Sequence, residues 1–302
     1  MSKPKKQHYV PQTYLKKFSF SDSSALQKIF VLHKNQARIF CTNIRDTAAE
    51  RHFYTVKKSD DQYLWENTYA KEIEPLMSNT LSRIISQCEN ELIQNHAVVL
   101  TQEMKNQLSI TIVCQLLRGV QSRIFQRNIY KEVVPSVIKD VREHFKPMDE
   151  AKEKIVKAFI EDDDYFKLAS MQATFDVKRL EKYTNILLQK CILVYRVIGN
   201  AEFITSDNPI MFLDSLSLNS KPFSNGLKQL TTVVYFPISP KLLIAVYDPN
   251  LYFGALSEYD KKVIFIDCYK DISFIKMHNH KQFEQCFNQV YAKSKEDLEG
   301  LN

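Results

Sequence analysis

The chain has 302 residues, of which 44% are hydrophobic and 12% aromatic, with a formal net charge of +6. This composition can bury a large apolar core, which excludes a disordered chain. The five glycines form neither G-x-G-x-x-G nor G-x-x-x-x-G-K-[ST], so a Rossmann dinucleotide site and a P-loop are not expected. The mild positive charge is compatible with a nucleic-acid partner and equally with an ordinary solubilising surface.

The compartment is predicted from the cysteines and from the apolar runs. Six cysteines are scattered without a C-x-x-C pair, which is typical of free thiols in a reducing compartment. Neither a signal peptide nor an apolar run of 18 residues is present in the sequence. We therefore expect a cytoplasmic protein that does not associate with membranes.

The predicted elements change character along the chain. Residues 28–32 and 37–41 alternate as two strands of a hairpin around the turn at 34–36. Apolar residues then recur at spacings of three and four, which predicts helices at about 62–95, from Thr101 through Ile124, and at 132–145, 150–160 and 165–189. Pro75 predicts a kink or break within the first of them. After residue 190, strands are predicted at 192–198, 202–205, 232–236, 242–246 and 263–266, and a final helix at 271–293.

This order predicts an α+β fold. We expect one mixed, mostly antiparallel sheet made from residues near 28–41 and 191–267, with a large central helical segment. The organisation expected is a single domain, residues 1–302. Its helical lobe, at about 62–190, is inserted between the hairpin (28–41) and the C-terminal sheet region (191–294).

Several motifs resemble one known family. The opening run from His8 to Phe18, HYVPQTYLKKF, and the later run FITSDNP at residues 203–209 carry the resemblance most specifically. AERHFY at residues 49–54, two spaced glutamates, and QLLR at residues 115–118 follow in the same order. The chain thereby resembles the bacterial family known as domain of unknown function 4238. The resemblance implies a bacterial protein and marks these residues, but it implies no reaction.

His8 is the most suggestive side chain, because an imidazole titrates near neutral pH and can serve as a base, an acid or a metal ligand. Pro11 stiffens this segment, and Gln12 follows it. Two interpretations stay open: a catalytic His8 with Gln12 binding substrate, or a structural anchor in which both side chains are hydrogen-bonded into the fold.

Glu66 and Glu74 lie two helical turns apart, about 80° around an ideal helix. They are candidates for acid–base work or for holding a divalent metal. The alternative is a pair of solvated charges on the surface of a helix.

Gln115 and Arg118 lie three residues apart beside an apolar helical stripe. Arg118 can clamp a phosphate or carboxylate, with Gln115 as a second substrate-binding residue. The alternative is an internal ion pair of Arg118 with Glu66 or Glu74 that fixes helix packing.

Asp207 and Asn208 follow a predicted strand, where loops often carry sites. Asp207 is a candidate catalytic residue or metal ligand, and Asn208 a substrate-binding residue. Ordinary turn chemistry explains the Asp-Asn-Pro sequence equally well.

The sharpest hypothesis from these residues is a metal-assisted hydrolase, a nuclease or phosphodiesterase, acting on nucleic acid or a nucleotide. In it His8 is the base, Arg118 steadies the phosphate, and a divalent ion is held by Glu66, Glu74 and Asp207. The second hypothesis is a non-catalytic binding or interaction module in which the same residues form a structural polar network.

Overall fold

Five of the strands after residue 190 form a sheet that is covered on both faces. The computed structural model describes residues 6–21, 25–144, 149–219 and 226–301. The strand order is β11-β6-β10-β9-β8, in which only the β11–β6 pair is parallel. The strands are β6 (Cys191–Ile198), β8 (Met211–Asp214), β9 (Thr232–Ser239), β10 (Leu242–Tyr247) and β11 (Val263–Asp267).

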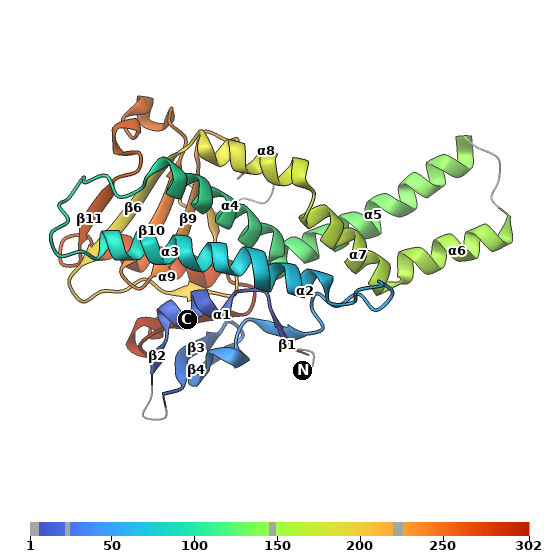
Figure 1. Cartoon of the computed structure of the whole chain (residues 1–302), viewed down its shortest axis with the longest axis horizontal. Helices are drawn as coiled ribbons and strands as arrows, with labels where there is room; N and C mark the ends of the chain where they lie inside the picture. Colours follow the sequence, from blue (N-terminus) through green and yellow to red (C-terminus); the bar gives the residue numbers. More distant parts are fainter. Residues whose placement is uncertain (1–5, 22–24, 145–148, 220–225, 302) are drawn as a thin grey trace.

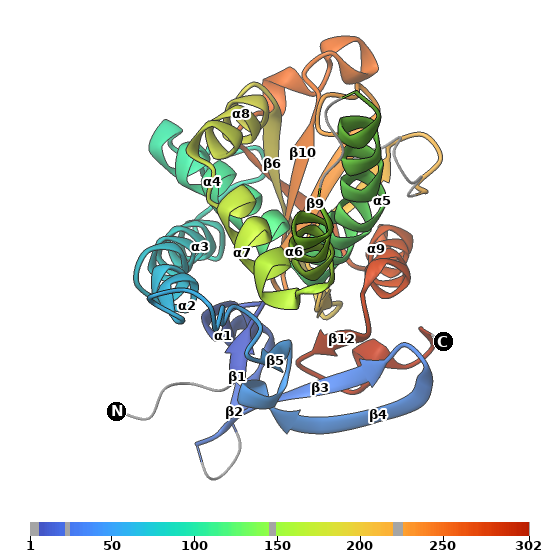
Figure 2. The ribbon, with the colours of Figure 1, turned by 90° about the vertical axis from the view of Figure 1, so that its right-hand side faces the viewer.

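The two faces of this sheet belong to different buried clusters. In β10, Ile244 packs in the cluster that holds the helices α3 and α4, while its neighbour Leu243 packs in the cluster that includes α9. Because successive side chains of a strand point to opposite faces, a strand buried on both sides is a continuous apolar run. Figure 2 shows α3, α4 and α8 on one side of the sheet and α9 on the other.

The N-terminal hairpin belongs to a second sheet. That sheet has the order β2-β3-β12-β7. β4 also pairs with β3, outside this order. Its strands are β2 (Phe20–Ser21), β3 (Gln27–His33), β4 (Gln36–Asn43), β7 (Thr205–Ser206) and β12 (Gln289–Ala292). A separate two-stranded ribbon pairs β1 (Lys6–His8) with β5 (Ala49–Arg51).

The α+β class with mostly antiparallel strands and a central helical segment is thus confirmed. The hairpin was expected to join one sheet with the strands at 191–267. It lies in the second sheet instead, where β3 pairs with β12. Residues 289–292 were predicted to end the last helix. They form a strand instead, in which Val290, Tyr291 and Ala292 are all buried.

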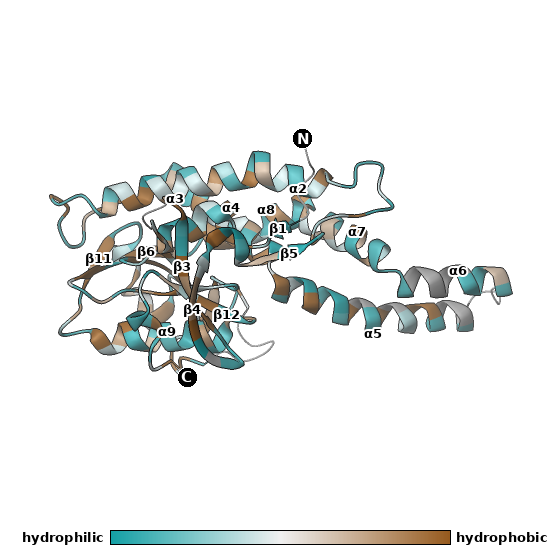
Figure 3. Cartoon of the chain, turned by 90° about the horizontal axis from the view of Figure 1, so that it is seen from below, coloured by the Kyte–Doolittle hydropathy of each residue, from teal (hydrophilic) through white to brown (hydrophobic). Residues whose placement is uncertain are grey.

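Nine α-helices are present in the described part of the chain. They are α1 (Gln12–Leu15), α2 (Leu64–Thr68), α3 (Glu74–Cys88), α4 (Gln102–Arg118), α5 (Val120–His144), α6 (Glu150–Glu161), α7 (Asp163–Thr174), α8 (Val177–Leu188) and α9 (Ile272–Gln285). None of the helices described is long and apolar enough to cross a membrane. In Figures 1 and 3, α5 and α6 extend away from the sheets.

The predicted helix at 62–95 is interrupted where Pro75 requires it. A π-helical turn, Tyr69–Ile73, separates α2 from α3, and Pro75 occupies the first turn of α3. Proline cannot donate to a preceding carbonyl and is tolerated in a first turn, so the helix restarts there.

The helix that follows Thr101 is capped as expected but is shorter. The Thr101 hydroxyl accepts a hydrogen bond from the Met104 amide at 3.1 Å. Gly119 ends α4 with extended backbone, so the apolar stripe does not continue, and Ile124 on α5 is 41% exposed. The organisation of the chain as one domain with an inserted helical lobe stays a prediction.

Candidate functional site

The N-terminal segment lies across the C-terminal end of α4. Gln115 donates to the Tyr9 carbonyl at 3.0 Å, and Arg118 Nη2 donates to the His8 carbonyl at 2.6 Å. Pro11, at φ −58° and ψ 139°, then turns the chain into α1. Figure 2 shows β1 and α1 next to α2 and α3. The predicted site residues near the N-terminus therefore meet those of α4.

Arg118 is the centre of this cluster. Its side chain is 1% exposed and forms an ion pair with Glu74 at 3.0 Å. Its Nε donates to the Tyr54 hydroxyl at 3.1 Å, and that hydroxyl donates in turn to the His8 carbonyl at 3.2 Å. The guanidinium carbon lies 4.2 Å from the centroid of the Tyr69 ring. The internal ion pair considered from the sequence is present, with Glu74 as the partner.

Glu66 reaches the same cluster from α2. Burial raises the pKa of Glu66 to about 7, the charge of Glu74 adds to this rise, and Arg118 opposes it. Such coupling requires the three charges to lie near one another. The ion pair joins Glu74 and Arg118, and the charges of both act on Glu66. The π-helical turn between α2 and α3 changes the angle between the two glutamates expected from a straight helix.

His8 contributes a largely buried, neutral imidazole. Burial lowers the pKa of His8, although the charge of Glu74 acts to raise it. The Gln12 amide nitrogen lies 3.5 Å from Nδ1. Which ring nitrogen donates depends on the tautomer, and the expected role of His8 as a base stays a prediction.

Several buried atoms of this cluster have no hydrogen-bond partner. They are His8 Nε2, Tyr69 Oη, Arg118 Nη1, Arg123 Nη2 and Gln115 Oε1. The two guanidinium nitrogens are donors, and the Tyr69 hydroxyl can donate. Buried donors without acceptors are costly, so this group fits an anionic ligand.

Three side chains of the cluster were missed in the sequence. Tyr54 and Tyr69 hold or cover Arg118, and Arg123 lies on the Phe53 ring with its guanidinium carbon 3.6 Å from the ring centroid. The similarity of AERHFY to a family motif pointed to Tyr54, but no spacing indicated Tyr69 or Arg123.

Asp207 and Asn208 are bonded to another part of the chain. The Asp207 carboxylate accepts from the amides of Phe287, Asn288 and Gln289 at 2.7, 2.7 and 2.9 Å. The Asn208 side chain donates to a carbonyl at the end of α9 at 3.0 Å. These bonds join β7 to the connection between α9 and β12.

The hydrogen bonds of Asp207 matter for the metal site that was expected at Glu66, Glu74 and Asp207. Within the described ranges, no group of three or more His, Cys, Asp and Glu side chains is placed to hold a metal ion. Burial raises the pKa of Asp207 to about 6, although the three amides act to lower it. The structure does not assemble these three carboxylates as one ligand set.

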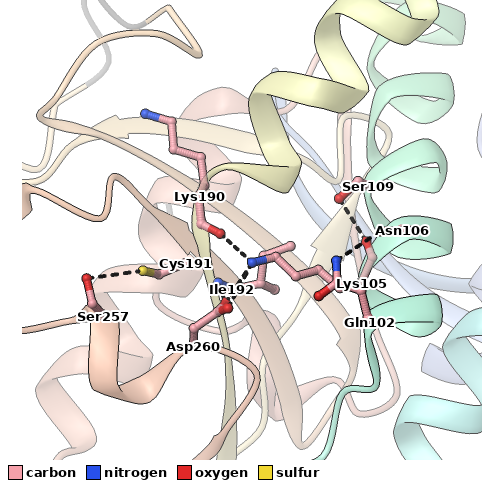
Figure 4. Close-up of polar contacts among 9 residues, drawn as sticks. All are labelled: Gln102, Lys105, Asn106, Ser109, Lys190, Cys191, Ile192, Ser257 and Asp260. Carbon is pink, nitrogen blue, oxygen red and sulfur yellow. Dashed lines mark hydrogen bonds and ion pairs between the residues drawn. The ribbon is translucent and has the colours of Figure 1, made fainter.

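A second buried cation lies at the other end of α4 and serves for comparison. Figure 4 shows Lys105 donating to both oxygens of Asp260 at 2.9 Å and to the Lys190 carbonyl at 2.7 Å. Asp260 also accepts from the Ile192 amide at 2.8 Å. All three donor positions of this ammonium are occupied, so the arrangement is a structural link between α4 and the large sheet.

Together, these observations define an α+β protein with an internal polar cluster that joins its N-terminal segment to its helices. The chain belongs to the family described as "Protein of unknown function (DUF4238)", whose sequence profile matches residues 6–296, nearly the whole chain. No curated protein and no solved structure matches the chain.

Proposed function

We propose that the protein is a hydrolase that cleaves a phosphate ester at the cluster of His8, Glu66, Glu74 and Arg118. Arg118 and the His8 imidazole donate hydrogen bonds to the phosphate. Glu66 is the general base, and Glu74 orients Arg118 through their ion pair. The observation that carries the proposal is a carboxylate with a pKa of about 7 beside buried donors that have no acceptor.

The chemistry is a direct hydrolysis. A water oxygen bonds to phosphorus while the ester P–O bond breaks. One proton of the water passes to Glu66, which then gives it to the leaving oxygen. A base is most effective when its pKa lies near the working pH, and this condition is met by Glu66. Donors around the phosphate stabilise the charge that develops on its oxygens.

The metal-assisted form of this hypothesis has less support. It requires a third carboxylate beside Glu66 and Glu74, whereas Asp207 already accepts three backbone amides. Our proposal therefore assigns the proton transfer to side chains of the chain itself.

The second candidate is a non-catalytic binding module, and a specific observation favours it. Arg118, Gln115 and Arg123 each donate to a main-chain carbonyl, those of His8, Tyr9 and Phe53. Such bonds hold chain segments together whether or not a substrate is bound.

Hydrolysis of bis(p-nitrophenyl) phosphate separates the two candidates. The wild type should release p-nitrophenol in EDTA, and Glu66→Gln should reduce kcat by at least 100-fold with little change in KM. Glu72→Gln is the matched control, because Glu72 is an exposed carboxylate on the π-helical turn between α2 and α3.

The outcomes are clear-cut. Equal rates for wild type and Glu66→Gln, both folded by circular dichroism, would refute the hydrolase with Glu66 as its base. Activity that appears only with added Mg²⁺ or Mn²⁺ would restore the metal-assisted form. A wild type that is inactive in EDTA and in both metals would leave the binding module as the better description.

A further inference from the structure

An open apolar groove lies between α5 and α7. It has a volume of about 340 Å³. The apolar side chains that line it are Phe125, Ile129 and Val133 on α5 and Phe166, Ala169 and Ala173 on α7. In Figure 1, α5 leaves the rest of the molecule beside α7. None of these six residues belongs to the cluster around Arg118, so the groove is a separate surface.

The spacing of the lining residues explains why this surface is hollow. Phe125, Ile129 and Val133 recur every four residues, so they form one row along α5 that is about 12 Å long. On α7, Ala169 and Ala173 are also four residues apart. Because an alanine side chain ends at Cβ, these two residues leave space beside the longer side chains of α5.

The α5 side of the groove is exposed to solvent. Phe125, Ile129 and Val133 expose 48%, 42% and 49% of their surfaces. Val137, four residues further along, exposes 52% and continues the row. A row of exposed large apolar side chains marks an interaction surface, and a row spaced by four is the pattern through which one helix packs on another. We therefore expect a helix to lie along the groove.

Arg179 gives the lining of the groove one positive charge. Its Nη1 donates to the Ala173 carbonyl at 3.3 Å, and its guanidinium carbon lies 5.8 Å from the centroid of the Tyr183 ring. Within the described part of the chain, no carboxylate forms an ion pair with Arg179. The two other polar lining residues, Ser170 and Gln126, are hydrogen-bonded to each other at 2.6 Å. A carboxylate on the partner would therefore complement Arg179.

We propose that the groove between α5 and α7 binds an amphipathic helix of a protein partner. This helix lays apolar side chains on the α5 row and places a carboxylate beside Arg179. The row spans about two helical turns, so apolar residues of the partner at i, i+4 and i+7 would fill it. A nucleic acid would require several cations along the groove, whereas its lining has one. The inference goes beyond the proposed function, because it concerns another surface and depends on no hydrolysis.

Fluorescence anisotropy of the full chain with a designed peptide tests the inference. The probe is a labelled helix-forming peptide of about 18 residues, since shorter helices are marginal in water. It carries leucines at i, i+4 and i+7 and a glutamate beside each end of this row. The wild type should bind it saturably, and Val133→Glu should weaken the binding about tenfold or more, because a charge then stands on the α5 row. Val98→Glu is the matched control, because Val98 is an exposed valine outside the groove.

A second peptide, with glutamines in place of the glutamates, tests the role of Arg179. The wild type should bind the glutamate peptide about threefold more tightly than the glutamine peptide. Arg179→Gln should bind the two peptides equally. A wild type that binds both peptides with the same affinity would overturn the assignment of a carboxylate to the partner.

Ala173→Leu fills the groove without adding a charge, so it should also weaken the binding, and it tests the groove if Val133→Glu does not fold. An absence of binding in the wild type, or equal binding in the wild type and both groove variants, would overturn the inference. Size-exclusion chromatography with light scattering tests the other occupant. A wild type that is dimeric, and a Val133→Glu variant that is monomeric, would place a second copy of the chain in the groove and reject the partner helix.

Discussion

The raised pKa of Glu66 makes a defined contribution to the pH dependence of stability. Its pKa rises from 4.5 in the unfolded chain to about 7 in the fold, so the folded state binds the proton more tightly. The contribution is fully present below pH 4.5 and is lost as the pH rises towards 7. The shift corresponds to about 3 kcal/mol if fully expressed, and to about 1–2 kcal/mol after allowance for the solvent that reaches this half-buried side chain.

Glu66→Gln removes this proton-binding group while keeping the shape of the side chain. The free energy of unfolding of Glu66→Gln, minus that of wild type, should therefore increase by about 1–2 kcal/mol between pH 4.5 and pH 7.5. Urea unfolding at half-unit steps of pH measures it, and the subtraction removes the common effects of other groups such as Asp207. Glu72→Gln should give a constant difference over the same range. A constant difference for Glu66→Gln as well would refute the placement of Glu66 in a desolvated cluster with Glu74.

Two further substitutions test the structural links. Asp207→Asn should lower the free energy of unfolding, measured with urea, by about 2–4 kcal/mol, because an amide offers one oxygen to three backbone N–H groups. A loss below about 1 kcal/mol would speak against that network. Lys105→Met should cost about 3 kcal/mol by leaving Asp260 without its cation, and the double variant Lys105→Met/Asp260→Leu should recover much of the loss. A double variant as unstable as the single one would contradict the ion-pair explanation.

Local signals in the sequence were sufficient for the class of the fold and for most elements. Period-two and continuous apolar runs gave β6, β9, β10 and β11, whereas β8 was not predicted and the strand expected at 202–205 is a strand only at Thr205. Thr101 marked a helix start because its hydroxyl caps an amide. The partners of the hairpin could not be predicted, since pairing between β3 and β12 joins segments about 260 residues apart. The helix predicted at 271–293 failed at its end for the same reason: the backbone of residues 287–289 is held by Asp207, which no local pattern reveals.

The candidate site was predicted in part. His8, Glu74 and Arg118 were chosen for their chemistry and for the family resemblance, and they meet in the structure through one guanidinium. Arg123 was not chosen, because its contact with Phe53 joins residues 70 positions apart and no local spacing reveals it. Asp207 shows the converse, since an acidic residue in a suggestive turn is fully used by neighbouring amides.

The two ends of α4 differ in how completely their buried polar groups are paired. At the N-terminal end, the three donor positions of Lys105 are matched by two carboxylate oxygens and one carbonyl, so its burial is explained by the chain alone. At the C-terminal end, the Arg118 side chain is buried to a similar extent, yet its Nη1 has no acceptor. Arg123 Nη2 and Tyr69 Oη also lack a hydrogen-bond partner. A network kept only to hold helices together would gain stability by pairing or replacing such groups. This group of donors, beside a carboxylate whose pKa is raised to about 7 by burial, is the physical basis of our proposal that an anionic substrate binds at this end of the helix.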